Sequence, residues 1–123
     1  MQHKISVDAM GGDFGPSVTI PASLKILKKY ENISIVLVGN ADEITQILKK
    51  KKSINHPRIT IHNATQIVGM DELPQSALKN KKDSSMRVSI NLVKEGVVDA
   101  CVSAGNTGAL MATARFVLRM LPG

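Results

Sequence analysis

Two short apolar runs in this chain lead directly into turns rich in glycine and small polar residues. The first run covers residues 5–7 and its turn covers residues 8–16, while the second run covers residues 100–102 and its turn covers residues 103–108. Apolar residues at helical spacing follow each turn, so each segment predicts a strand that runs through a tight turn into a helix. Only architectures in which strands and helices alternate accommodate both units.

The rest of the chain repeats this alternation. Strands are expected over residues 5–8, 33–38, 58–62 and 99–103. Helices are expected over residues 17–30, from the cap Asn40 into the lysine run 49–52, over 75–80, from Asp83 or Ser84 to a stop at Gly96, and over 107–120, where Leu110, Ala114, Val117, Leu118 and Leu121 face inward. This order predicts one α/β domain over residues 1–123 with a mostly parallel sheet. Ligands of such sheets bind at the carboxyl ends of the strands, and the loop 70–74 is expected at that edge with both turns.

Pro21 leaves the start of the first helix open. Proline is favoured in the first turn of a helix, so Pro16 fits a start there, but a proline inside a helix kinks it. Either the helix runs through Pro21 with a kink, or it begins there and residues 16–20 form a loop.

Composition narrows the class of protein and its partners. The chain is 43% hydrophobic but has two Phe, one Tyr and no Trp, so its core must be aliphatic. Aromatic platforms for single-stranded nucleic acid are missing, and no nucleic-acid partner is predicted. The net charge of +6 gathers in residues 49–52 and at Lys79, Lys81 and Lys82. These lysines are either solvated helix ends or a surface that attracts an acidic partner.

Neither a metal nor an organic cofactor is expected. The single cysteine, Cys101, lies in an apolar run and is predicted to be a small buried residue rather than a nucleophile. His3, His56 and His62 show no metal-ligand spacing with each other or with Cys101. The chain does not open with a signal-peptide pattern, and the apolar stretch 35–38 is too short to span a bilayer, so a cytoplasmic protein is predicted.

The second turn has the composition of a site for phosphate or another oxyanion. The first backbone N–H groups of a helix lack internal partners, and the helix dipole adds positive charge at that end. Gly105 and Gly108 allow close approach, and Ser103, Asn106 and Thr107 supply polar side chains. An ordinary N-cap needs only one polar residue, so an anion site is favoured over a cap in which Asn106 or Thr107 satisfies the free amides.

The first turn is less specific. Gly11, Gly12 and Asp13 fit a tight turn with Asp13 as a local cap, or a site where Asp13 orients a cationic group or accepts a proton. Asp8 is a second carboxylate at the same edge. Neither turn matches a P-loop or a dinucleotide-binding pattern, and no Ser-His-Asp or Cys-His set is recognisable. If the chain is an enzyme, a bound anion is expected to act as the nucleophile, with catalysis by positioning and oxyanion stabilisation.

Four motifs closely resemble the bacterial phosphate acyltransferases of phospholipid synthesis. They are Val-Asp-Ala-Met-Gly-Gly-Asp-Phe-Gly-Pro at 7–16, Met-Asp-Glu at 70–72, Lys-Lys-Asp-Ser-Ser-Met-Arg at 81–87 and Cys-Val-Ser-Ala-Gly-Asn-Thr-Gly-Ala-Leu-Met at 101–111. The family chain is much longer, so the resemblance implies an incomplete, N-terminal part of a three-layer α/β/α fold like that of isopropylmalate dehydrogenases and phosphotransacetylases. It implies transfer of an acyl group from acyl carrier protein to inorganic phosphate, by a cytoplasmic homodimer that associates with the membrane.

The resemblance also implies roles for individual residues. Asn106 and Asp13 are the expected catalytic residues. Contacts to the phosphate or the acyl carbonyl are expected from Gly11, Gly12, Ser103, Gly105, Asn106, Thr107 and Gly108. Ser84, Ser85 and Arg87 are further candidates for these contacts, with a helix cap and a surface cation as the alternative interpretation.

Two other interpretations stay open. The chain could be a phosphate- or nucleotide-binding α/β module without catalysis, which binds the anion but transfers no acyl group. Alternatively, the two glycine turns serve the fold alone and hold no anion.

Overall fold

The computed structural model describes residues 2–118, in which strands and helices alternate. The elements are β1 (His3–Asp8), α1 (Pro16–Lys29), β2 (Ile33–Gly39), α2 (Ala41–Lys50), β3 (Ile59–Asn63), α3 (Pro74–Asn80), α4 (Ser85–Lys94), β4 (Ala100–Val102) and α5 (Thr107–Leu118). Every expected strand and helix is present in this range, with boundaries shifted by one to three residues. The expected end of the last helix at Met120 and the inward side chain of Leu121 lie outside the described residues.

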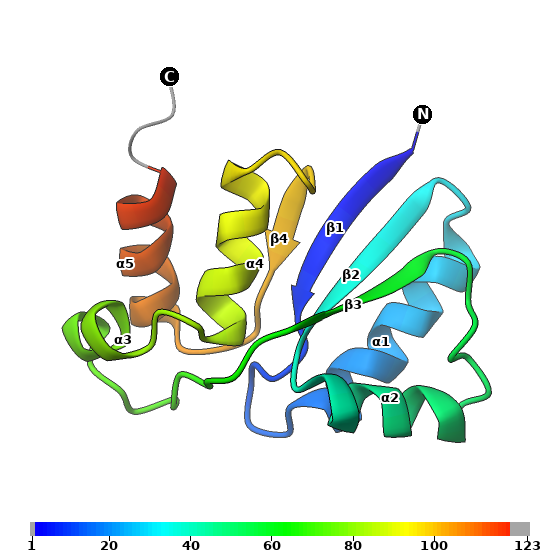
Figure 1. Ribbon diagram of the computed structural model, residues 1–123, viewed down its shortest axis with the longest axis horizontal. Coiled ribbons are helices and arrows are strands. Elements are labelled where there is room, and N and C mark those ends of the chain that lie inside the picture. The colour runs from blue at the N-terminus through cyan, green and yellow to red at the C-terminus, as the bar shows by residue number, and fades with distance from the viewer. Residues whose placement is uncertain (1, 119–123) are drawn as a thin grey trace.

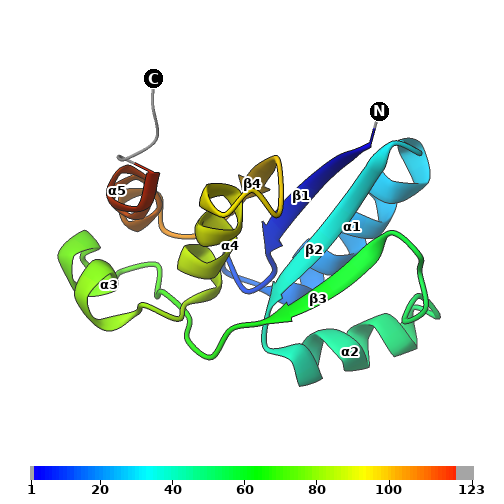
Figure 2. The ribbon, with the colours of Figure 1, turned by 45° about the horizontal axis from the view of Figure 1, so that its top comes forward.

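The four strands form one fully parallel sheet in the order β3-β2-β1-β4. Helices α1 and α2 cover one face and α4 covers the other, while α5 packs beside α4 and α3 packs on α5 (Figures 1 and 2). The predicted three-layer α/β/α arrangement is therefore confirmed. Because the strands are parallel, β1 and β4 end at the same edge as β2 and β3, and every strand-to-helix turn starts there.

The central strand β2 is covered on both faces, as a near-continuous apolar run predicts. Leu37 packs against Ile20 of α1 and Ile44 of α2 on one face. Val38, the next residue, packs against Val88 of α4 on the other face. All of these side chains are aliphatic, in line with the composition, and they hold the strand ends at the functional edge in place.

Helix α1 begins at Pro16 and runs through Pro21, so residues 16–20 are helical and do not form a loop. Pro16 occupies the first turn, where its missing N–H costs nothing. The preceding residue Gly15 has φ of 57°, a value that favours glycine, and it turns the chain from the end of β1 into the helix.

Side-chain caps begin the next two long helices. The Asn40 side chain accepts a hydrogen bond from the Glu43 N–H at 3.0 Å and starts α2, as expected. Ser84, and not Asp83, caps α4 by accepting from the Arg87 N–H at 3.0 Å. Gly96, with φ of 76°, follows the end of α4 as predicted.

Arg58 joins the end of α1 to the start of β2. Its guanidinium donates to the carbonyls of Leu27 at 2.6 Å, Tyr30 at 2.7 Å and Ile33 at 2.8 Å. We expect Arg58→Ala to lower the free energy of unfolding by about 2 kcal/mol, because charge-assisted hydrogen bonds are lost at three carbonyls. Arg58→Lys keeps the charge but not the planar fork, so it should recover only part of this loss in chemical denaturation. An alanine variant as stable as the parent would contradict the role.

Candidate functional site

The two glycine turns pack directly against each other at the carboxyl edge of the sheet. A Cβ atom built on Gly11 would lie 3.0 Å from the backbone nitrogen of Gly105 and 2.9 Å from Oδ2 of Asp8. A Cβ built on Gly105 would lie 3.0 Å from the Met86 side chain. Gly11 is therefore restricted to glycine by its neighbours, whereas a methyl group at Gly105 would first meet the flexible end of the Met86 side chain. The close approach of Gly11 to the Gly105 nitrogen makes the two turns one structural unit.

Asp8 is the polar centre of this unit. Its side chain is 2% exposed, Oδ2 accepts from the Ser103 hydroxyl at 2.8 Å, and Oδ1 accepts from the Met10 N–H at 3.3 Å. The same Ser103 oxygen accepts from the Gly105 N–H at 3.1 Å. Asp8 thus fixes the second turn through Ser103. The sequence predicted Asp8 at this edge but did not include it among the site residues. Its role is the contact with Ser103, which is distant in sequence, and no local pattern reveals it.

Asn106 is committed to the fold by all of its side-chain groups. Its Oδ1 accepts from the Ala109 N–H at 3.1 Å, which caps α5, and its Nδ2 donates to the carbonyls of Gly69 at 3.1 Å and Glu72 at 2.7 Å. The side chain is only 8% exposed. The cap interpretation of Asn106 therefore holds for its side chain, which orders the turn instead of reaching out to a ligand.

The backbone at the start of α5 keeps free donors despite this cap. The cap satisfies the Ala109 N–H, but the N–H groups of Asn106, Thr107 and Gly108 donate to no protein atom within residues 2–118. Thr107 and Gly108 are exposed residues, whereas Asn106 is buried. Converging amides at the positive end of a helix are suited to an oxyanion. The negative charge of the nearby Asp8 opposes this attraction.

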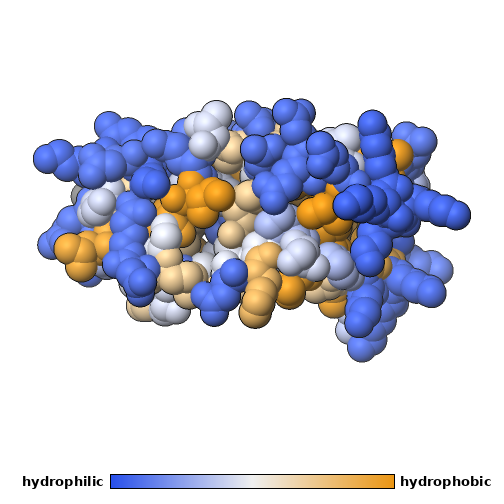
Figure 3. Space-filling view, turned by 90° about the horizontal axis from the view of Figure 1, so that it is seen from below, coloured by the Kyte–Doolittle hydropathy of each residue, from blue (hydrophilic) through white to orange (hydrophobic). Residues whose placement is uncertain are grey.

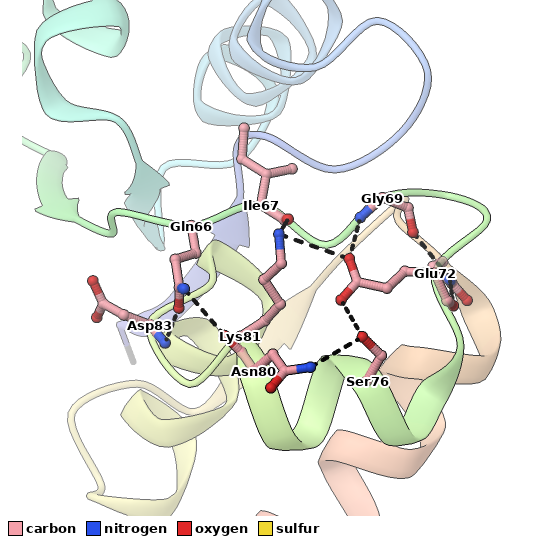
Figure 4. Close-up of polar contacts among 9 residues, drawn as sticks. Gln66, Ile67, Gly69, Glu72, Ser76, Asn80, Lys81 and Asp83 are labelled. Carbon is pink, nitrogen blue, oxygen red and sulfur yellow. Dashed lines mark hydrogen bonds and ion pairs between the residues drawn. The ribbon is translucent and has the colours of Figure 1, made fainter.

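The segment between β3 and α4 contacts the second glycine turn through Asn106. Figure 4 shows the Glu72 carboxylate between Gly69, Ser76 and Lys81. Its oxygens accept from the Gly69 N–H at 3.2 Å and the Ser76 hydroxyl at 3.3 Å, and Lys81 Nζ lies 3.8 Å away. Lys81 Nζ also donates to the Ile67 carbonyl at 2.9 Å. This network orders the loop whose carbonyls bind Asn106, and it confirms the expected place of that loop.

Asp83 closes the same segment and gives it a pH dependence. The Thr65 hydroxyl donates to Asp83 at 2.6 Å and the Thr65 N–H at 2.9 Å, and these bonds lower the pKa of Asp83 below its ordinary value. Because the pKa of Asp83 is lower in the folded state, ionised Asp83 stabilises the fold above about pH 4. This stabilisation is lost as the pH falls further and Asp83 becomes protonated. We expect the stability difference between the parent and Asp83→Asn to be constant above about pH 5 and to shrink below about pH 4. A difference that does not change with pH in urea denaturation would contradict this.

Three other residues expected in the site, Gly12, Asp13 and Ser85, lie in different surroundings. Gly12 lies at the contact between the turns, where a Cβ would approach Ala104 at 3.5 Å, and its φ of 86° favours glycine. Asp13 is exposed and makes no hydrogen bond or ion pair with any described residue. Ser85 is buried at the start of α4, one residue before the Met86 side chain that reaches Gly105.

Arg87 faces away from the turns. Its guanidinium donates to the Leu78 carbonyl at 3.1 Å and stacks on the Phe116 ring at 5.2 Å. Phe116 is about 14 Å along the axis of α5 from Thr107, given the rise of a helix. Arg87 therefore ties α3 and α4 to α5 and is not the surface cation of the alternative interpretation, while a contact from Arg87 to phosphate stays a prediction.

Cys101 has the properties of an unreactive thiol. Burial raises the pKa of the Cys101 thiol above its ordinary value, and the negative charge of Asp8 raises it further. The reactive thiolate is accordingly scarce at neutral pH. Cys101 is half-buried and not buried as predicted, while its raised pKa is in line with the prediction that it is not a nucleophile.

The edge that carries the turns is neutral or apolar in its middle and hydrophilic on both sides (Figure 3). The lysines 49–52 are exposed in the last turn of α2 and directly after it, whereas Lys81 is engaged with Glu72 and Ile67. Across residues 2–118 no cluster of three or more His, Cys, Asp and Glu could hold a metal ion. None of the described helices is both long and apolar enough to cross a membrane.

Comparison with known proteins finds one matching family and several similar proteins that share a name. A family model described as Fatty acid synthesis protein matches residues 3–123. Proteins of Herminiimonas arsenicoxydans and Janthinobacterium sp. (strain Marseille), both named phosphate acyltransferase, are 56% and 57% identical over all 123 residues. One of Francisella philomiragia subsp. philomiragia with the same name is 58% identical over 129 residues and also covers all of the chain. The chain spans 34% of the first two relatives and 37% of the third, about a third of their length.

Proposed function

The chain belongs to the family of fatty acid synthesis proteins, and from this membership we propose that it forms the phosphate-binding part of a phosphate acyltransferase in bacterial phospholipid synthesis. The observation that carries the proposal is the set of free amides of Asn106, Thr107 and Gly108 at the start of α5. The name of the relatives supports phosphate as the anion and an acyl group as its partner.

The proposed reaction transfers an acyl group from a carrier-protein thioester to inorganic phosphate. A phosphate oxygen attacks the thioester carbonyl carbon, a carbon–oxygen bond forms, and the carbon–sulfur bond breaks. The leaving thiolate takes up the proton that the hydrogen phosphate loses, and the products are acyl phosphate and free carrier protein. The free amides at the start of α5 hold and aim the phosphate, or stabilise the carbonyl oxygen as it gains charge.

The contacts within the site assign supporting roles to the side chains. Asn106 orders the turn through its cap and its bonds to Gly69 and Glu72, so it is a positioning residue in this proposal. Asp8 holds the second turn in place through Ser103, whose hydroxyl oxygen accepts from the Gly105 N–H. Asp13 is exposed at the same edge and is the proposed proton acceptor.

A proline at position 107 tests the proposed role of the amides. Thr107→Pro removes one N–H donor at the first helical position, where proline fits a helix well. We expect phosphate affinity to fall about tenfold, since one charge-assisted hydrogen bond is lost. Thr107→Ala keeps the N–H and should change the affinity less than threefold. Equal affinities of the proline and alanine variants, measured by calorimetry, would contradict the proposal.

An acyl carrier protein is the proposed donor, and the charge of the chain supports an acidic partner. The net charge is +6, and residues 49–52 offer four exposed lysines at the end of α2. Long-range attraction between such a surface and an acidic protein speeds association and weakens with salt. Cytoplasmic location, a homodimer and peripheral membrane association are further proposals from the family resemblance. Fractionation, sedimentation equilibrium and vesicle flotation test them.

A non-catalytic phosphate-binding module is the second candidate. It is favoured by the lack of contacts of Asp13 within the described residues. Acyl phosphate formation by this chain and by the Herminiimonas arsenicoxydans relative, assayed side by side, separates the candidates. Transfer by the relative supports the enzyme, whereas phosphate binding without transfer by either protein supports the module.

A further inference from the structure

Residues 69–72 form a tight turn that is closed by the side chain of its own last residue, Glu72. The Glu72 N–H donates to the Gly69 carbonyl at 3.1 Å, the hydrogen bond of a β-turn. The Glu72 side chain is 16% exposed, and one carboxylate oxygen accepts from the Gly69 N–H at 3.2 Å and lies 3.8 Å from Lys81 Nζ. The other oxygen accepts from the Ser76 hydroxyl at 3.3 Å (Figure 4). The carboxylate therefore joins both ends of the 69–72 turn to α3 and to Lys81.

The carbonyls at the two ends of the 69–72 turn hold the side-chain amide of Asn106. Asn106 Nδ2 donates to the Gly69 carbonyl at 3.1 Å and to the Glu72 carbonyl at 2.7 Å. A side-chain amide nitrogen has two N–H donors, so both are used at this turn. Oδ1 is then directed at the Ala109 N–H, from which it accepts at 3.1 Å. The shape of the 69–72 turn therefore sets the position of Asn106 and of the free amides beside it.

The charge of Glu72 and its contacts act on a bound anion in opposite directions. A carboxylate repels phosphate, so removal of the charge alone tightens binding. Removal of the contacts frees the 69–72 turn and, with it, Asn106, which weakens binding. The sign of the change in phosphate affinity thus distinguishes an effect of position from an effect of charge.

We propose that Glu72 is a positioning residue for the anion site at the start of α5. It shapes the turn that holds Asn106, and Asn106 holds the free amides in place. The inference rests on the proposed function, because the role is defined toward the phosphate that these amides bind. It also gives a role to the Met-Asp-Glu motif at 70–72, which the proposed reaction does not use. In this role Glu72 needs no contact with phosphate.

Glu72→Ala and Glu72→Gln test the role in this chain, because both remove the charge but only one removes the contacts. Glutamine has the same length, its oxygen can accept from the Gly69 N–H, and its NH₂ group can donate to the Ser76 oxygen. By calorimetry we expect phosphate affinity to fall about tenfold in Glu72→Ala, since hydrogen bonds that shape the turn are lost. In Glu72→Gln, which loses only the ion pair with Lys81, it should stay within about threefold of the parent.

Asp71→Ala is the matched control for the charge. Asp71 belongs to the same turn, is exposed, and makes no hydrogen bond or ion pair with any described residue. Its loss removes a negative charge and leaves the 69–72 turn intact. We expect phosphate to bind Asp71→Ala at least as tightly as the parent.

Hydrogen exchange of the Asn106 side-chain amide, followed by NMR, gives a readout that needs no phosphate. We expect exchange about tenfold faster in Glu72→Ala than in Glu72→Gln or Asp71→Ala. The backbone amides of β2 are the internal reference, because a general loss of stability would speed their exchange as well. Ser76→Ala removes one partner of the carboxylate without a change in charge, in a helix that favours alanine. It replaces Glu72→Ala if that variant does not fold, with an expected loss of about threefold in both measurements.

The outcomes separate this inference from the proposed function. Weaker phosphate binding in Glu72→Ala but not in Glu72→Gln or Asp71→Ala, with faster exchange confined to Asn106, supports the positioning role. Binding by Glu72→Ala as tight as by Asp71→Ala, an equal loss in both Glu72 variants, or exchange that rises equally at Asn106 and in β2 overturns the role and leaves the anion site standing. No binding of phosphate by the parent chain overturns the proposed anion site, and the inference falls with it.

Discussion

Replacing Gly11 with alanine is expected to lower the free energy of unfolding by about 3 kcal/mol and to weaken phosphate binding about tenfold. The added Cβ would lie 2.9 Å from Asp8 Oδ2 and 3.0 Å from the Gly105 nitrogen. The Asp8 carboxylate cannot move aside freely, because Ser103 and Met10 hold it by hydrogen bonds. The methyl group therefore separates the two turns or detaches Asp8, and both changes displace the amides at the start of α5.

Gly69→Ala is the matched control for this prediction. The nearest atom to a Cβ at Gly69 is Glu72 Oε1 at 4.0 Å, so the methyl group has room. We expect a change in unfolding free energy below about 0.5 kcal/mol and an unchanged phosphate affinity. Denaturant unfolding and calorimetry on both variants check the pair. If Gly11→Ala behaves like Gly69→Ala, the two turns do not form one unit.

Asn106→Ala is expected to cost about 3 kcal/mol of unfolding free energy. The estimate adds about 1 kcal/mol for the lost cap and about 1 kcal/mol for each of the hydrogen bonds to Gly69 and Glu72. Phosphate binding should fall as well, because the turn that presents the amides loses its link to the loop. The loss of affinity should exceed that of Thr107→Ala, which leaves the turn intact.

Asn106→Asp separates the cap from the other two bonds. Aspartate is as good an N-cap as asparagine, so the bond to the Ala109 N–H should survive, but a carboxylate cannot donate to the Gly69 and Glu72 carbonyls. We expect a loss of stability at least as large as in Asn106→Ala, because a buried carboxylate oxygen would face the two carbonyl oxygens without a partner. Phosphate affinity should fall further than in Asn106→Ala, because a negative charge is added beside the amides. Tighter phosphate binding in Asn106→Asp would contradict a site for anions at this turn.

Much of the fold could be predicted because local signals agreed with the final packing. The apolar run of β2, the Asn40 cap and the Gly96 stop each correspond to a feature of the structure. Whether the first helix begins before Pro21 or at it could not be predicted. The helix continues through Pro21 because Ile20 and Leu27 pack in the core, and the propensity of a single residue does not reveal such packing. That α5 packs on α3 and α4 also depends on contacts distant in sequence.

The site could be located from the sequence but not built from it. The glycine turns were expected at one edge, and they meet there. The partners of the Asn106 side chain are backbone carbonyls of a loop more than thirty positions away, and no local pattern reveals them. The stacking of Arg87 on Phe116 is of the same kind. Residue types therefore indicated the chemistry, while tertiary contacts decided which side chains serve the fold.

The central claim is that the free amides at the start of α5 hold phosphate, and an NMR titration of backbone amides tests it most directly. Phosphate added at constant ionic strength should shift the amide resonances of Asn106, Thr107 and Gly108 in a saturable way, and chloride should not. Unchanged resonances at these residues, or equal shifts with chloride, would contradict the account.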